Sequence, residues 1–113
     1  KSILMKYWVI VIPNLTANAM AVYPFIFLKS KDQKLDEILI NHEKIHLCQQ
    51  IELLLLPFYF LYLFNYLINL IKYKNHYQAY YHISFEKEAY QYEKELCYLN
   101  NRRRYNWINF YSE

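Results

Sequence analysis

Nineteen consecutive residues without a charge, from Leu53 to Ile71, constrain the fold of this chain more than any other feature. A helix of that length is long enough to cross a bilayer. Pro57 lies near the start of the run, and proline fits the first turn of a helix but disrupts a helix interior. The sequence therefore predicts one helix that ends before Pro57 and a second, strongly apolar helix that begins there.

The helix before Pro57 carries two histidines and a glutamate in the segment His42-Glu43-Lys44-Ile45-His46. Residues four apart share one face of a helix, so both imidazoles can point at one metal ion, and zinc is the ion that this pattern indicates. Glu43 then lies close enough to a water molecule at the metal to accept its proton.

A capping box predicts where this helix starts, because Gln33 follows Ser30 by three residues. Apolar residues then recur at helical spacing, and both histidines continue their stripe, so we expect the histidines to face the interior. The stripe consists of Leu35, Ile38, Leu39, His42, Ile45, His46, Gln49 and Leu53.

A zinc ion that acts on a substrate usually has three protein ligands and one open position, so the chain must supply a third ligand. The best candidate is Glu86, on a predicted helix from Ser84 to Asn100 in which Ser84 is the expected N-cap. Glu88 on the same helix is the alternative ligand, and His76 and His82 in the preceding tyrosine-rich connector are further candidates. An ordinary solvated helix face is the competing interpretation of the two glutamates.

The N-terminal part of the chain predicts β structure. Tyr7–Ile12 is rich in β-branched and aromatic residues and ends at a turn signal, and Ala19–Leu28 forms a second apolar segment. Pro24 cannot donate a ladder hydrogen bond, so we expect this second strand to be an edge or to carry a bulge. The two segments predict a hairpin or a small sheet, and the fold class is α+β.

The metal site and a simple membrane span exclude each other. If Leu53–Ile71 crossed a bilayer once, Glu86 would lie on the side opposite His46, and the polar segment 72–85 cannot cross hydrocarbon to return. The apolar run must therefore fold back. Two hypotheses remain, a core helix that packs against the β-hairpin and a helix that lies against a membrane.

The two motifs together resemble the gluzincin class of zinc metallopeptidases. Several branches of that class, the compact minigluzincins among them, pair the HExxH pattern with a later helical Glu-x-x-Ala-Asp or Glu-x-x-Ala-Asn, and Glu86 and Ala89 match this second motif. Gln49-Gln50 resembles the HExxHxxQQ start of some small bacterial members. The resemblance, which covers about residues 19–99, implies a single zincin-like domain over residues 1–113. Its N-terminal hairpin or small sheet would pack on a mainly helical core of three to four helices.

The resemblance also implies a function, a zinc-dependent metallopeptidase. It implies that Zn²⁺ is held by His42, His46 and Glu86, with Glu43 as the general base and a peptide or protein as the substrate. One departure stands out: Tyr90 occupies the position of the acidic residue that, in the class, holds a zinc-binding histidine. The alternative is therefore a non-catalytic metal-binding or membrane-associated protein that shares the fold.

Composition excludes some functions and limits the expected location. The chain has no glycine, which excludes phosphate-cradling loops. The arginines at 102–104 are expected to form a solvated or interfacial end, so nucleic acid is not an expected partner, while contact with a membrane surface remains an option. Cys48 and Cys97 do not form a disulfide framework and are expected to be packing thiols in a reducing compartment. Since the apolar run Tyr7–Ile12 is too short for an export signal, we expect a cytoplasmic protein or one peripheral on the cytoplasmic face of the membrane.

Overall fold

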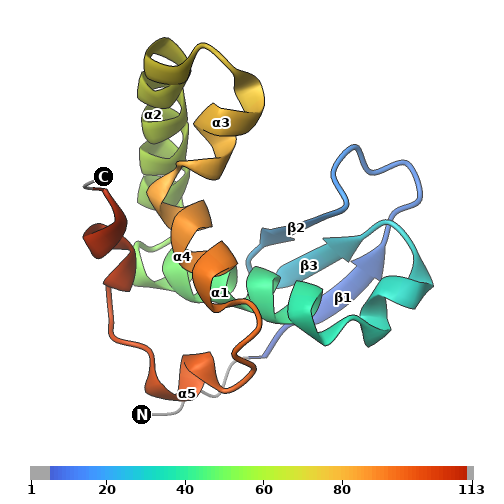
Figure 1. Cartoon of the computed structure of the whole chain (residues 1–113). Coiled ribbons are helices and arrows are strands. Elements are labelled where there is room, and N and C mark those ends of the chain that lie inside the picture. Colours follow the sequence, from blue (N-terminus) through green and yellow to red (C-terminus); the bar gives the residue numbers. More distant parts are fainter. Residues whose placement is uncertain (1–5, 112–113) are drawn as a thin grey trace.

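The computed structural model describes residues 6–111, and the fold is α+β as expected. A three-stranded sheet lies on one side of a central helix, and further helices form the rest of the molecule (Figure 1). This arrangement puts the predicted metal ligands between the central helix and a later helix that returns to it.

The sheet contains β1 (Trp8–Val11), β2 (Ala19–Val22) and β3 (Phe25–Leu28) in the order β1-β3-β2. The predicted strand Ala19–Leu28 is thus two strands, which form an antiparallel hairpin around a turn at Tyr23-Pro24. Pro24 lies in the turn, where it has no ladder hydrogen bond to donate, and β3 occupies the centre of the sheet. The expectation of an edge strand thus holds for the first half of the segment, β2, and is wrong for its second half, β3; the other edge of the sheet is β1.

The central helix is α1 (Glu37–Glu52), and it begins later than the capping box predicts. Gln33 accepts a hydrogen bond from the Ser30 N–H, but this pair caps a 3₁₀ turn, η1 (Lys31–Leu35). The Asp36 carboxylate caps α1 itself by accepting a hydrogen bond from the Leu39 N–H at 3.1 Å. The start of the predicted apolar stripe is consequently wrong, since Leu35 lies before the helix and is exposed.

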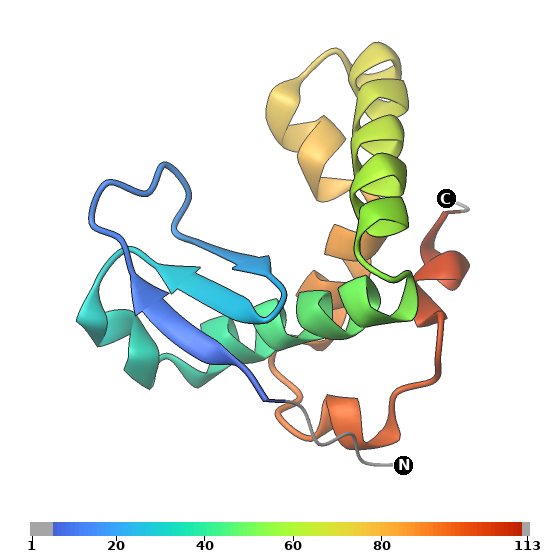
Figure 2. The same ribbon diagram turned by 180° about the vertical axis from the view of Figure 1, so that it is seen from behind.

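The helix α2 (Leu56–Tyr73) has Pro57 in its first turn, close to the predicted start, and is bent by 114° relative to α1. Leu54 and Leu55 form the sharp turn between the two helices, and both have a positive φ. Glycine adopts this conformation most easily, but the chain contains no glycine, so leucines occupy both positions. Figure 2 shows α1 running beneath the sheet and α2 leading away from its end.

The remaining helices return the chain to α1. They are α3 (His76–Tyr81), α4 (Ser84–Tyr92), α5 (Tyr98–Asn101) and a 3₁₀ turn, η2 (Asn106–Phe110). The predicted helix from Ser84 to Asn100 is thus interrupted after Tyr92. Ser84 is the first helical residue instead of the N-cap, and its hydroxyl donates to the Trp107 carbonyl.

The core consists of three small apolar clusters arranged around α1 and α4. Leu47 packs with Ile26 and Leu28 of the sheet, and Ile45 packs with Ala89 on the opposite side. The third cluster joins the start of α2 to α4 and η2 and comprises Phe58, Ile83, Phe85 and Trp107. Because α1 is covered on several faces, its polar residues at the centre of the fold are buried as well.

The helix α2 contributes little to this core. Only Phe58 and Asn69 among its residues are buried, and its main neighbour is α3. The hypothesis that the apolar run packs against the hairpin as a core helix was therefore wrong. Within residues 6–111, no single helix has the length and hydropathy to span a membrane; α1 and α2 meet that criterion only as a bent pair.

A buried arginine fixes the C-terminal segment to α1 and α4. Arg102 makes hydrogen-bonded ion pairs with Glu52, at 2.6 Å, and with Glu88, whose side chain is fully buried. Glu52 also accepts hydrogen bonds from the Trp107 indole at 3.2 Å and from the Tyr105 N–H at 2.9 Å. The expectation that all of residues 102–104 form a solvated end was thus wrong for Arg102, because two carboxylates compensate its burial.

Replacing Arg102 with methionine should lower the free energy of unfolding by about 3–5 kcal/mol, because Glu88 would remain buried without a cation. Chemical denaturation followed by circular dichroism measures this loss. The matched change Arg103→Met, at an exposed neighbour, should alter stability by less than about 0.5 kcal/mol. Equal effects of the two changes would contradict the role given to Arg102.

Candidate metal centre

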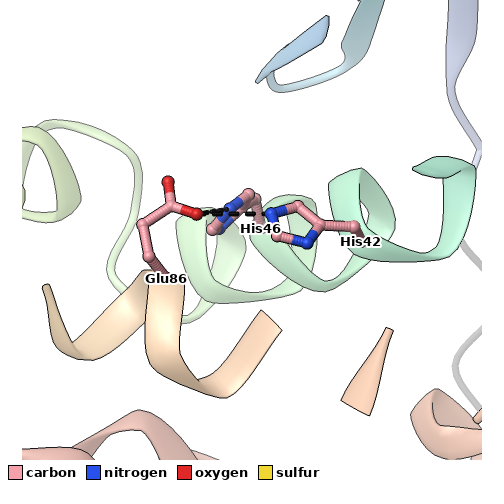
Figure 3. A group of neighbouring side chains, drawn as sticks. All are labelled: His42, His46 and Glu86. Carbon is pink, nitrogen blue, oxygen red and sulfur yellow. Dashed lines mark hydrogen bonds and ion pairs between the residues drawn. The ribbon is translucent and has the colours of Figure 1, made fainter. Parts of the chain in front are cut away.

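Three side chains that the sequence predicts as zinc ligands converge on one point. His42 and His46 extend from the same face of α1, and Glu86 extends from the first turn of α4 (Figure 3). The Oε1 atom of Glu86 lies 3.2 Å from Nε2 of His42 and 3.1 Å from Nε2 of His46. All three residues are buried, and their potential ligand atoms lie within 4.8 Å of one another.

Gln49 determines which nitrogen of His46 carries a hydrogen. The Gln49 amide nitrogen donates to the Phe85 carbonyl at 3.1 Å and to Glu88 at 2.9 Å, and both partners are acceptors. Its amide oxygen must therefore face Nδ1 of His46, 2.8 Å away, and accept a hydrogen bond from it. In the neutral ring the lone pair is then on Nε2, directed at Glu86.

Glu93 determines which nitrogen of His42 carries a hydrogen. Its carboxylate lies 2.8 Å from Nδ1 of His42 and accepts a hydrogen bond from that nitrogen. Tyr90, which occupies the sequence position of the expected partner, instead packs its ring edge-on against His42 with centroids 4.6 Å apart. The acidic partner is thus present, three residues later than the pattern predicts. A hydrogen bond of this kind orients a metal-binding histidine and raises its basicity.

The convergence of acceptors requires a positive charge. Neutral His42 and His46 would present two lone pairs to the carboxylate of Glu86, and three acceptors in contact repel unless a proton or a metal ion lies between them. Burial alone would lower the pKa of His46, but the Glu86 carboxylate raises that pKa to about 9. Burial alone would raise the pKa of Glu86, yet the two histidines hold it well below its usual range.

These donors fit zinc. Two imidazole nitrogens and one carboxylate oxygen are a ligand set that proteins use for catalytic zinc, with a fourth position left open. The second carboxylate oxygen of Glu86 accepts a hydrogen bond from the Tyr62 hydroxyl at 2.6 Å, which leaves Oε1 as the oxygen directed at the histidines. A divalent ion would supply the positive charge that a proton supplies otherwise.

Glu43 is buried beside the three ligands and borders open space. Burial raises the pKa of its carboxyl, and the positive charge on His46 and His42 partly opposes that rise. Two cavities meet at this residue. One has a volume of about 330 Å³ and lies between β2 and α2; the other, of about 620 Å³, lies on the side of α3. Glu43 and Tyr80 line both cavities.

The other candidate ligands lie elsewhere. Glu88 is engaged by Arg102, Gln49 and Tyr98 and does not belong to the cluster. His76 contacts the Tyr66 hydroxyl at 2.9 Å, and His82 stacks on Tyr73.

The two cysteines are free, and neither belongs to the cluster. Cys48 is buried among apolar residues, as expected of a packing thiol. Cys97 is exposed, so its expected packing role was wrong.

Sequence reasoning missed Glu93 and Tyr62 as neighbours of the ligands. Glu93 follows Glu86 by seven residues, a spacing of two helical turns that puts both on the same face of α4 and its C-cap. That spacing is a usable signal for Glu93. Tyr62 has no such signal, because its contact with Glu86 depends on the angle between α2 and α4.

Comparisons with protein-family models, with curated proteins and with solved structures found no match to this chain.

Removing the Glu93 carboxylate should weaken zinc binding by about 10–100-fold, because His42 would lose the partner that orients it. Competition with a chromophoric chelator measures the affinity of a Glu93→Ala variant. Tyr90→Phe keeps the ring against His42 and should change the affinity by less than about threefold. Glu95→Ala, at an exposed glutamate nearby, is the matched control. Weaker binding in Tyr90→Phe than in Glu93→Ala would contradict this assignment.

Proposed function

We propose that the protein is a zinc-dependent metallopeptidase. One observation supports this function above all: two histidine Nε2 atoms and one carboxylate oxygen converge next to a buried glutamate, where two cavities meet. A purely structural zinc site would usually be closed by a fourth protein ligand, and within residues 6–111 the cluster has only three.

Each residue has a distinct role in the proposed reaction. Zinc bound to His42, His46 and Glu86 would lower the pKa of a water molecule and polarise the scissile carbonyl. Glu43 accepts the proton of the attacking water and delivers it to the amine that leaves. The raised pKa of its carboxyl suits a group that must both take up and release a proton.

The edge strand β2 is the proposed binding element for a peptide. Residues of β2 line the smaller cavity together with Glu43 and His46, so a chain paired with β2 would pass the ligands. The Gln50 side chain already bonds the Ala21 carbonyl at 2.8 Å and the Tyr23 N–H at 2.7 Å, as a neighbouring strand would. The backbone groups of β2 before Ala21 are therefore left to pair with a substrate.

Apolar substrate side chains fit the smaller cavity best. Its walls include Met20 and Val22 of β2 and Phe58 and Tyr59 of α2, and apolar surface dominates. Burial of an apolar side chain there would hold the peptide next to Glu43.

The alternative is a metal-binding or membrane-associated protein without turnover. One observation in its favour was Tyr90 in place of an acidic partner, and the Glu93 carboxylate beside His42 supports the peptidase instead. The unpaired cysteines agree with a reducing compartment, and we propose that the protein acts in the cytoplasm or at the cytoplasmic face of the membrane.

Replacing Glu43 with glutamine should reduce peptide hydrolysis at least about 100-fold while zinc remains bound, because the amide cannot accept the proton. Cleavage of quenched fluorescent peptides with apolar residues around the scissile bond measures the rate, and metal analysis of the same sample measures the zinc. Glu37→Gln, at an exposed glutamate of the same helix, is the matched control and should keep full activity. Full activity in Glu43→Gln would contradict the mechanism.

A further inference from the structure

The helices α2 and α3 form an arm with almost no charge. Between Leu53 and Phe85 the only charged residues are Lys72 and Lys74, and both are exposed. The arm leads away from the end of α1 (Figures 1 and 2). Its composition is therefore unusual for a surface that only contacts water.

One side of α2 is a continuous exposed apolar face, on the side away from α3. The helix buries Phe58 and Asn69 on the opposite side, and Asn69 donates to the Ala79 carbonyl of α3. At the helical spacing of 100° per residue, the six most central residues of the face cover an arc of roughly 140°. They are 46–77% exposed and comprise Phe60, Leu63, Phe64, Leu67, Ile68 and Ile71.

The width of this face indicates what covers it. Tyr59 and Leu61 border it and are 37% exposed each, which widens the arc to roughly 200°. The stripe that packs against a single partner helix is about 100° wide, so such a contact would leave half of the face in water. A helix that lies in a lipid surface to the depth of its axis is covered over about half of its circumference.

The charges of the arm indicate the kind of lipid. Lys72 and Lys74 end the face, and residues 53–85 contain no carboxylate side chain. A second copy of the arm would bring the same two lysines and no acid to pair with them. Anionic lipid headgroups would attract both lysines.

We propose that α2 lies in the plane of an anionic membrane surface, with its exposed apolar face in the lipid and Lys72 and Lys74 among the headgroups. Tyr59, which borders the face, also lines the cavity between β2 and α2, so one wall of that cavity is then next to the lipid. If the proposed peptidase function holds, the substrates are peptide segments that lie at a membrane surface.

Flotation with vesicles tests this proposal without using the metal site, so its failure is distinguishable from failure of the peptidase function. The full chain should float with vesicles of phosphatidylcholine and phosphatidylglycerol and bind vesicles of phosphatidylcholine alone at least about tenfold less. The double variant Phe60→Ser/Phe64→Ser should lose at least about tenfold in vesicle binding.

Two further variants separate the contribution of the lysines and that of exposed apolar residues outside the arm. Lys72→Glu/Lys74→Glu should abolish the preference for anionic vesicles. Leu35→Ser/Leu96→Ser removes two exposed leucines outside the arm and should bind as the parent does. Circular dichroism spectra that match the parent establish that each variant is folded.

Three results would overturn the proposal. The first is a parent chain that binds no vesicles, and the second is vesicle binding that Phe60→Ser/Phe64→Ser leaves unchanged. The third is a lipid-free dimer, seen by sedimentation equilibrium, that the same double variant dissociates, since a second copy would then cover the face.

Discussion

The meeting of two histidine lone pairs with one buried carboxylate is the interaction on which the other features of this molecule depend. His42, His46 and Glu86 are stable together only with a positive charge between them. Two of these residues are on α1 and the third is on α4, so the chain between them must leave and return. The turn after α1, with its bend of 114°, and the α2–α3 arm provide that excursion. Apart from Phe58 in the third core cluster, α2 contributes little to the core, and its apolar side is left exposed.

A chain of hydrogen bonds connects the metal centre to the C-terminal segment. It runs from His46 through Gln49 and Glu88 to Arg102 and then to Glu52. Each hydrogen bond fixes which atom donates in the next one. Arg102 can only donate and the Glu88 carboxylate can only accept, so the Gln49 amide nitrogen faces Glu88 and its oxygen faces His46. Within residues 6–111 no buried polar side-chain atom lacks a hydrogen-bond partner. The segment after α5, although short and rich in arginine, is thus part of the support of the site.

Local chemistry made some features predictable from the sequence. Pro57 marks the start of α2, and the spacing of His42 and His46 puts both on one face of α1. The features that sequence reasoning missed depend on tertiary contacts. Arg102 resembles a solvated residue until Glu52 and Glu88 are brought to it, because only folding supplies the two carboxylates that compensate its burial. The Glu93 carboxylate was missed for another reason. The pattern considers only the residue four positions after Glu86, whereas Glu93 lies seven positions after it, at the C-cap of α4.

A zinc titration of the parent chain and of a Glu86→Ala variant is the most direct test of the central claim. We expect one zinc ion per parent chain. We also expect the zinc affinity of the variant to fall by more than the roughly 10–100-fold expected from loss of a hydrogen bond to a ligand. Absence of zinc from the parent, or an unchanged affinity in Glu86→Ala, would contradict the claim that His42, His46 and Glu86 hold one metal ion.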